Sequence, residues 1–133
     1  MNKKELLDKA FEAMNNAYAP YSHYLVGACV LTKDGEYTLG ANIENASYGA
    51  TNCGERTAVF AAYAKGYRKD DIEALAIVTN GGRIGAPCGI CRQVLSELLN
   101  KDTPIILSNG VDEKITNADE LLPFSFGAED LVK

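Results

Sequence analysis

Two short motifs built on cysteine constrain the fold of this chain more than any other feature. The first reads Cys-Gly-Glu-Arg from Cys53, and the second reads Pro-Cys-Gly-Ile-Cys and ends at Cys91. Each motif falls where we expect a helix to begin. The free N–H groups and the positive dipole end of a helix start favour a thiolate over a thiol. The fold is therefore expected to bring two helix starts together around one ion.

Cys53, Cys88 and Cys91 are the expected ligands of one zinc ion. Cys88 and Cys91 are three residues apart, which places them on one face of a first helical turn. Three thiolates can hold zinc and leave its fourth position open, as a catalytic site requires. A closed zinc site with a fourth ligand elsewhere is one alternative, and a redox-active Cys-x-x-Cys pair is another.

Glu55 is expected to be the catalytic acid and base, not a fourth ligand. A carboxylate beside the open position can take a proton from water and pass it to a leaving amine, so it serves both halves of a hydrolysis. Arg56 is expected to offset the negative charge of three thiolates by donating hydrogen bonds to sulfur. Arg92 is a second candidate for that role, and a solvated helix residue is the alternative for Arg56.

Composition restricts the partners and the compartment. A chain of 133 residues is expected to form one domain, residues 1–133. Acidic residues outnumber basic ones by 18 to 13, which favours a small-molecule substrate and argues against a nucleic acid partner. With no signal peptide and no membrane span expected, we predict a cytoplasmic protein. Cys29 is expected to be a buried apolar residue, and His23 a loop or surface residue.

The apolar patterns predict an α/β fold in which helices pack on a mixed sheet. The expected helices cover residues 3–18, 53–65, 87–99 and 117–122, and the expected strands cover 24–31, 37–41, 73–79, 104–108 and 114–116.

Taken together, the sequence resembles the small, homotetrameric class of zinc-dependent cytidine deaminases, nearly end to end. Besides the cysteine motifs, the resemblance is carried by Pro20–Tyr24, Val26–Ala28, Gly40–Tyr48 and Leu121–Phe126. It implies a three-layer α/β/α fold with a mixed five-stranded sheet. It also implies hydrolytic deamination of cytidine and 2′-deoxycytidine to uridine and 2′-deoxyuridine, a pyrimidine salvage reaction, with one Zn²⁺ in each subunit.

The resemblance further assigns substrate contacts. Asn42 and Glu44 would bind the ribose hydroxyls, Tyr24 would pack on the substrate, and the Gly54 N–H would hold the carbonyl oxygen of the base. Residues from a neighbouring subunit would complete each pocket in the homotetramer, namely Ala46, Tyr48 and Phe126. From the residues alone, turn chemistry is the preferred interpretation of Asn42 and Glu44. Tyr48 and Phe126 are equally consistent with burial in their own chain.

Two positions depart from the family pattern. Tyr24 replaces a common phenylalanine, and it can still stack. Gly54 stands where the family usually has alanine, and the missing methyl group predicts extra room near the reacting carbon. That room would favour an alternative substrate: a modified or amine-substituted cytosine nucleoside, or an aminonucleoside antibiotic. A non-enzymatic zinc module is the more distant alternative.

Overall fold

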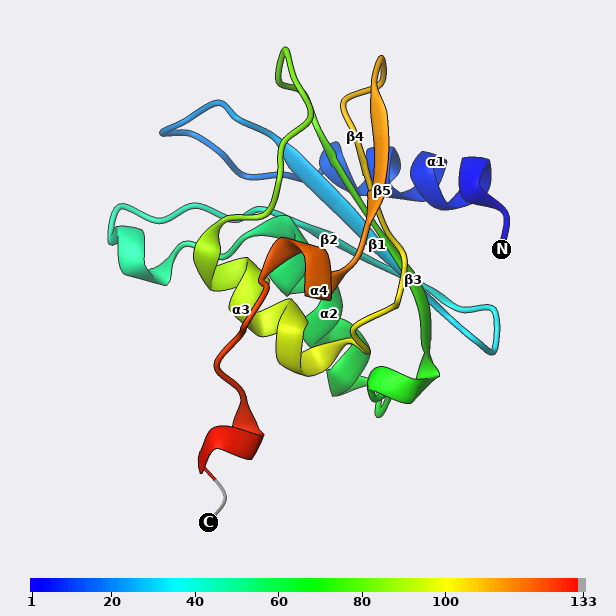
Figure 1. Ribbon diagram of the computed structural model, residues 1–133. Coiled ribbons are helices and arrows are strands. Elements are labelled where there is room, and N and C mark those ends of the chain that lie inside the picture. Colours follow the sequence, from blue (N-terminus) through cyan, green and yellow to red (C-terminus); the bar gives the residue numbers. More distant parts are fainter. Residues whose placement is uncertain (132–133) are drawn as a thin grey trace.

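The computed structural model describes residues 1–131, and its centre is a mixed five-stranded sheet (Figure 1). The strands lie in the order β2-β1-β3-β4-β5. All neighbouring pairs are antiparallel except β3 and β4, which are parallel. The strands are β1 (Val26–Thr32), β2 (Tyr37–Ala41), β3 (Ile72–Thr79), β4 (Ile105–Ser108) and β5 (Glu113–Thr116). The mixed five-stranded sheet is thus confirmed.

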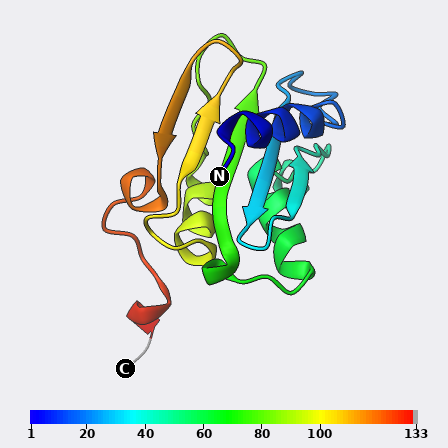
Figure 2. The same cartoon turned by 90° about the vertical axis from the view of Figure 1, so that its right-hand side faces the viewer.

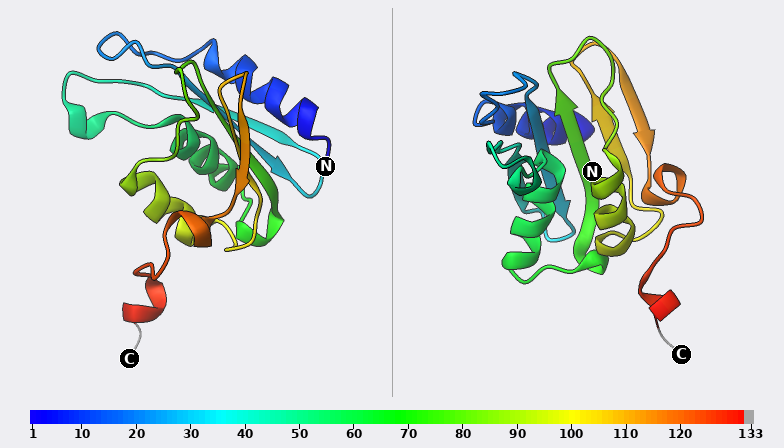
Figure 3. Two further views of the ribbon diagram at one scale, coloured as in Figure 1. Left: turned by 45° about the horizontal axis from the view of Figure 1, so that its top comes forward. Right: turned by 90° about the vertical axis from the view of Figure 1, so that its left-hand side faces the viewer.

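Helices cover both faces of the sheet. Within residues 1–131, the α-helices are α1 (Lys3–Met14), α2 (Gly54–Ala64), α3 (Gly89–Leu98) and α4 (Ala118–Leu121). The same part of the chain contains the short 3₁₀ helices η1 (Tyr48–Ala50), η2 (Lys69–Asp71) and η3 (Ala128–Leu131). Helix α1 lies on one face, while α2 and α3 lie side by side on the other (Figures 2 and 3). The predicted three-layer α/β/α arrangement is confirmed.

Strand β1 shows how the two faces are filled. Because side chains alternate along a strand, Ala28 and Val30 pack into the core beneath α2 and α3, whereas Cys29 and Leu31 pack into the core beneath α1. Cys29 is fully buried, and burial raises the pKa of its thiol to about 12. The prediction that Cys29 is a buried apolar residue is confirmed.

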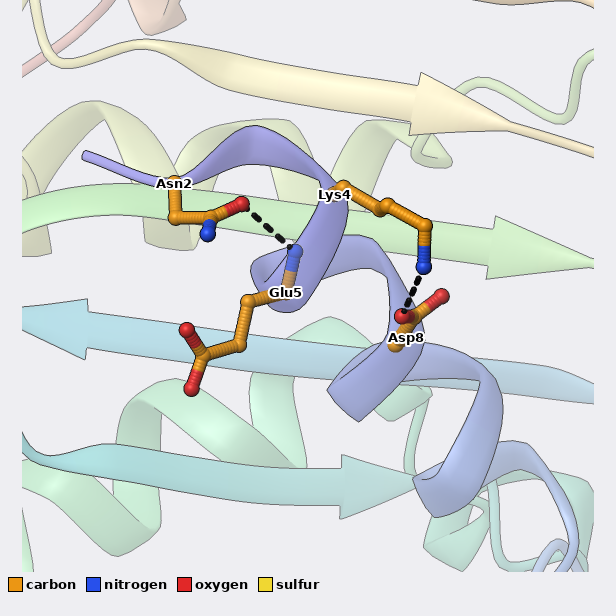
Figure 4. A network of polar contacts seen from close by, with 4 residues as sticks. All are labelled: Asn2, Lys4, Glu5 and Asp8. Atoms are coloured by element: carbon orange, nitrogen blue, oxygen red, sulfur yellow. Dashed lines mark hydrogen bonds and ion pairs between the residues drawn. The ribbon is translucent and has the colours of Figure 1, made fainter.

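Helix α1 is capped at its start by Asn2, whose Oδ1 accepts a hydrogen bond from the Glu5 N–H at 3.0 Å. Lys4 pairs with Asp8 one turn later, at 2.9 Å (Figure 4). The helix packs so closely on the sheet that a Cβ atom at Gly27 would lie 2.1 Å from the carbonyl oxygen of Ala10, so glycine is required there.

The prediction that this helix reaches Tyr18 is wrong, since α1 ends at Met14. Tyr18 instead extends the backbone pairing beside the loop that follows β2. Its N–H donates to the Asn42 carbonyl at 2.9 Å, and its own carbonyl accepts from the Glu44 N–H at 2.8 Å.

After α4 the chain runs past α3, where the Phe126 carbonyl accepts a hydrogen bond from Gln93 Nε2 at 2.8 Å, and η3 lies at the outer edge of the molecule (Figures 1 and 3). In residues 1–131, no helix combines the length and the apolar character needed to cross a membrane.

Candidate active site

Two helix starts meet on the layer formed by α2 and α3. Cys53 is the N-cap residue of α2, Cys88 is the N-cap residue of α3, and Cys91 lies in the first turn of α3. The three Sγ atoms lie within 4.8 Å of one another. The structure therefore brings together the three cysteines that the two motifs predict as ligands.

The sulfur cluster has the character of a soft-metal site. The pKa of the Cys53 thiol is lowered to about 5, first by a hydrogen bond from Cys91 and then by the nearby Arg56 guanidinium. The reciprocal interaction raises the pKa of Cys91. Three sulfur ligands, two of them at helix starts that favour anions, fit zinc well. Within residues 1–131, the group at this spacing contains no fourth His, Cys, Asp or Glu.

Arg56 lies where the sequence predicted it. Its Nη2 donates to Cys53 Sγ at 3.5 Å and to the Thr51 carbonyl at 3.4 Å. The prediction that Arg92 shares this role is wrong, because the Arg92 Nε donates to the Pro87 carbonyl at 2.7 Å and Nη1 donates to the Leu121 carbonyl at 2.9 Å. Arg92 therefore ties the start of α3 to the end of α4.

Glu55 lies in the first turn of α2 and is only 4% exposed. Burial, and then the negative charge of the Cys53 thiolate, raise the pKa of its carboxyl group to about 7. Together with Cys53 and Cys88, Glu55 lines a pocket of about 250 Å³. A carboxyl group with such a pKa, placed beside an accessible thiolate cluster, suits proton transfer near neutral pH.

The other walls of this pocket include Tyr24, Asn42 and Glu44. Asn42 Oδ1 accepts from the Val26 N–H at 2.9 Å, and its Nδ2 donates to the Tyr24 carbonyl at 2.8 Å. The side chain of Asn42 thus fixes the entry into β1 while also facing the pocket. Its partners lie 16 and 18 residues away, so these are not the local turn contacts that the alternative supposed.

Glu44 combines the same two roles. Its carboxylate accepts hydrogen bonds from the backbone N–H groups of Tyr21 at 3.0 Å and Ser22 at 3.1 Å, and another from the Ser22 hydroxyl. The Ser22 hydroxyl is the main cause that lowers the pKa of Glu44. An ionised carboxylate is thereby fixed at the pocket wall, where it can accept hydrogen bonds from a ligand.

Gly54 does not create the predicted extra room. A Cβ atom at this position would lie 3.0 Å from Val26 Cγ1 and 3.2 Å from the Val26 carbonyl oxygen. Val26 therefore fills the place of the missing methyl group, and that place lies beneath the pocket wall, between α2 and β1. The expectation of added space is wrong because it considered position 54 without its neighbour.

Ala46, Tyr48 and Phe126 are exposed and do not line the pocket of their own chain. Tyr48 is 76% exposed and Phe126 is 59% exposed, so the alternative of burial in their own core does not hold. Tyr48 lies against an adjoining hollow that shares Glu44 with the pocket. His23, with a φ of 58°, is an exposed loop residue as predicted.

Sequence reasoning assigned no site role to several residues of the pocket, among them Thr79, Gly85 and Ala86. Thr79 ends β3 on the same side as Ile77, which also lines the pocket. The only available signal was the glycine-rich break after β3, and it did not reveal which side chains would face the site.

Comparisons with known proteins agree with the metal site that this geometry indicates. Residues 1–107 match the family model of the cytidine and deoxycytidylate deaminase zinc-binding region, a span that contains all three cysteines. A cytidine deaminase of Halalkalibacterium halodurans is 50% identical over 133 residues, covering 98% of each chain. One from Mycobacterium tuberculosis is 39% identical over 126 residues, covering 95% of this chain and 90% of the relative.

Solved structures agree with these relatives. The crystal structure of cytidine deaminase from Burkholderia pseudomallei superimposes with a TM-score of 0.91 at 45% identity, covering 95% of this chain and all of the other. That of the Mycobacterium tuberculosis enzyme gives 0.79 at 38% identity, covering 96% and 98%. The sulfur cluster, the sheet and these matches place the chain in the zinc-dependent cytidine and deoxycytidylate deaminase family.

Proposed function

We propose that the protein catalyses the hydrolytic deamination of cytidine and 2′-deoxycytidine to uridine and 2′-deoxyuridine, releasing ammonia. The observation that carries this proposal is a buried carboxyl group, Glu55, that lines one pocket together with two cysteines of the sulfur cluster. The full-length similarity to cytidine deaminases supports this choice of substrate over other cytosine compounds. A part in pyrimidine salvage and a cytoplasmic location belong to the same proposal.

Cys53, Cys88 and Cys91 would hold the zinc ion. When bound, zinc supplies Lewis-acid activation of the attacking water. Glu55 would accept a proton from the attacking water and deliver it to the ring nitrogen of the base. It would then take the second proton from the newly added hydroxyl group and pass it to the departing amine. Its burial keeps bulk water from competing for these protons. Arg56 would moderate the negative charge of the thiolates through its hydrogen bond to Cys53.

Other residues in and beside the pocket would hold the nucleoside. Asn42 and Glu44 would bind the ribose hydroxyls, since an amide and a carboxylate together offer donors and acceptors to a sugar edge. The Gly54 N–H would hold the carbonyl oxygen of the base, and Tyr24 would pack against its ring. These contacts fix the reacting carbon near Glu55, which is how positioning contributes to rate.

An ultraviolet assay tests the proposed function directly. Cytidine, 2′-deoxycytidine and an amine-substituted cytidine are supplied in turn, with and without a zinc chelator. We expect turnover of the first two substrates and loss of activity after chelation. Absence of turnover by the zinc-loaded protein would contradict the proposal.

The hypothesis of an amine-substituted substrate loses its support, because its only basis was the extra room expected at Gly54. We expect Gly54→Ala to leave the ratio of kcat/KM for cytidine and the substituted cytidine unchanged within about twofold, since the added methyl group meets Val26 instead of substrate. We expect the methyl contact at 3.0 Å to offset the helix-favouring effect of alanine at the start of α2, so that the free energy of unfolding changes by less than about 1 kcal/mol. Both quantities are measurable on one preparation, and a changed ratio would restore the alternative.

We propose in addition that the active form is a homotetramer in which Ala46, Tyr48 and Phe126 complete a neighbour's pocket. Their exposure supports this proposal, since apolar side chains left uncovered often mark an interface.

Complementation tests the shared pocket. Glu55→Gln and Phe126→Ala chains are each expected to be inactive or weak, but co-expression forms mixed tetramers. Some pockets then receive Glu55 from one chain and Phe126 from another, roughly a quarter of them for random mixing. Activity above the mean of the two parents is expected. Activity equal to that mean would show that Phe126 serves only its own chain.

A further inference from the structure

The ring of Tyr24 rests against the glycine-rich loop that leads from β3 to Cys88. A Cβ atom at Gly81 would lie 3.0 Å from Tyr24 Cε1, and one at Gly85 would lie 2.2 Å from the Tyr24 hydroxyl oxygen. The second distance is far shorter than any non-bonded contact. The Tyr24 hydroxyl thus occupies the place that any side chain at position 85 would need.

Thr79 lies on the other side of the position that a Cβ atom at Gly85 would occupy. The same Cβ position at Gly85 lies 2.9 Å from Thr79 Cγ2. Thr79 is buried at the end of a strand in the middle of the sheet, and a β-branched side chain has few rotamers to adopt. Tyr24 is 40% exposed, so its side chain has room to move. Tyr24 is therefore the residue that would shift if position 85 carried a side chain.

Thr79 also places a buried hydroxyl group beside this position. Thr79 Oγ1 is buried and has no hydrogen-bond partner among the residues that the structure describes. It lies 3.5 Å from the Cβ position at Gly85, close to where the Tyr24 hydroxyl lies.

We propose that Gly85 is a positioning residue for the reaction: because it has no side chain, Tyr24 can lie back against the end of β3 and form one wall of the nucleoside pocket. The inference rests on the proposed function, since it takes this pocket to be the nucleoside site. Gly85 and Tyr24 both line the pocket that contains Glu55, so a displaced Tyr24 alters the space beside the reacting groups.

The test compares Gly85→Ala with Gly82→Ala. The control lies in the same loop, adds the same methyl group, and meets nothing within 4 Å. We expect Gly85→Ala to raise KM for cytidine about tenfold while kcat changes less than about threefold, because the wall that receives the base moves. Gly82→Ala is expected to leave both constants unchanged.

A second substitution identifies the cause. Tyr24→Phe removes the oxygen that clashes at position 85, so in the Gly85→Ala background it is expected to recover most of the loss in KM, relative to Tyr24→Phe alone. A merely structural role of Gly85 would give additive effects instead. Gly81→Ala supplies a milder variant should Gly85→Ala fold poorly. The methyl group added at position 81 presses on a ring carbon of Tyr24, and phenylalanine retains that carbon. We therefore expect a rise in KM that Tyr24→Phe does not relieve.

Two results would overturn the inference: equal KM values for Gly85→Ala and Gly82→Ala, or a Gly85→Ala defect that Tyr24→Phe leaves unchanged. If the Gly85→Ala protein fails to fold, a KM for Gly81→Ala equal to that for Gly82→Ala overturns it as well. Zinc content and thermal unfolding are measured for every variant to confirm matched preparations. An inactive wild-type protein would instead refute the proposed function, so the two failures are distinguishable.

Discussion

Glu55→Gln is expected to lower kcat for cytidine by a factor of about 10² to 10⁴, the usual contribution of a general acid and base. Glutamine has nearly the same shape but cannot carry a proton between water, ring and amine. Zinc content should stay unchanged, because the metal group consists of Cys53, Cys88 and Cys91 without Glu55. Turnover is followed by ultraviolet absorbance, and zinc by elemental analysis of the same sample.

Glu44→Gln provides the matched control, since Glu44 is a second carboxylate in the pocket wall. It is expected to raise KM more than it lowers kcat, because its proposed role is binding the ribose. A Glu55→Gln protein whose kcat stays within about threefold of wild type would remove Glu55 from the chemistry.

Cys88→Ser is expected to abolish both zinc retention and activity. Serine is a favourable N-cap residue, so α3 can still begin after position 88, but its hydroxyl is a poor replacement for a thiolate ligand. Bound zinc is expected to fall well below one ion per chain, and kcat/KM to below about 1% of wild type. The loss should not be reversed by assaying at higher substrate concentration.

Cys29→Ala is the control for removing a cysteine. Cys29 is buried beneath α1, in a different core cluster from the helices that carry the sulfur ligands. This variant should retain zinc and activity while its free energy of unfolding falls by about 1 kcal/mol. Full zinc retention by Cys88→Ser would contradict the proposed ligand set.

The chemistry-bearing residues were predictable because they depend on local rules. Cysteines at helix starts, three residues apart or two residues before a glutamate, indicate the proposed ligands and the proposed acid without knowledge of the fold. Apolar runs, turn signals and helical apolar spacing likewise predicted the strands and the α-helices found in residues 1–131.

What failed depends on contacts between distant parts of the chain. Nothing near Gly54 indicates that Val26 fills the space of its missing methyl group, and nothing near Arg92 indicates that the Leu121 carbonyl accepts its hydrogen bond. The end of α1 was misplaced for the same reason, because Tyr18 pairs with the backbone of Asn42 and Glu44 instead of continuing the helix. Such contacts exist only once the layers are assembled.

The sulfur ligands come from the starts of two separate helices, so the ion that they hold is also a cross-link within the chain. Its binding favours the folded state over the unfolded one by mass action, by about 1.4 kcal/mol for each tenfold rise in free zinc above the dissociation constant. The melting temperature of this protein should therefore report the zinc supply of its surroundings, and a cell short of the metal would lose folded enzyme as well as turnover.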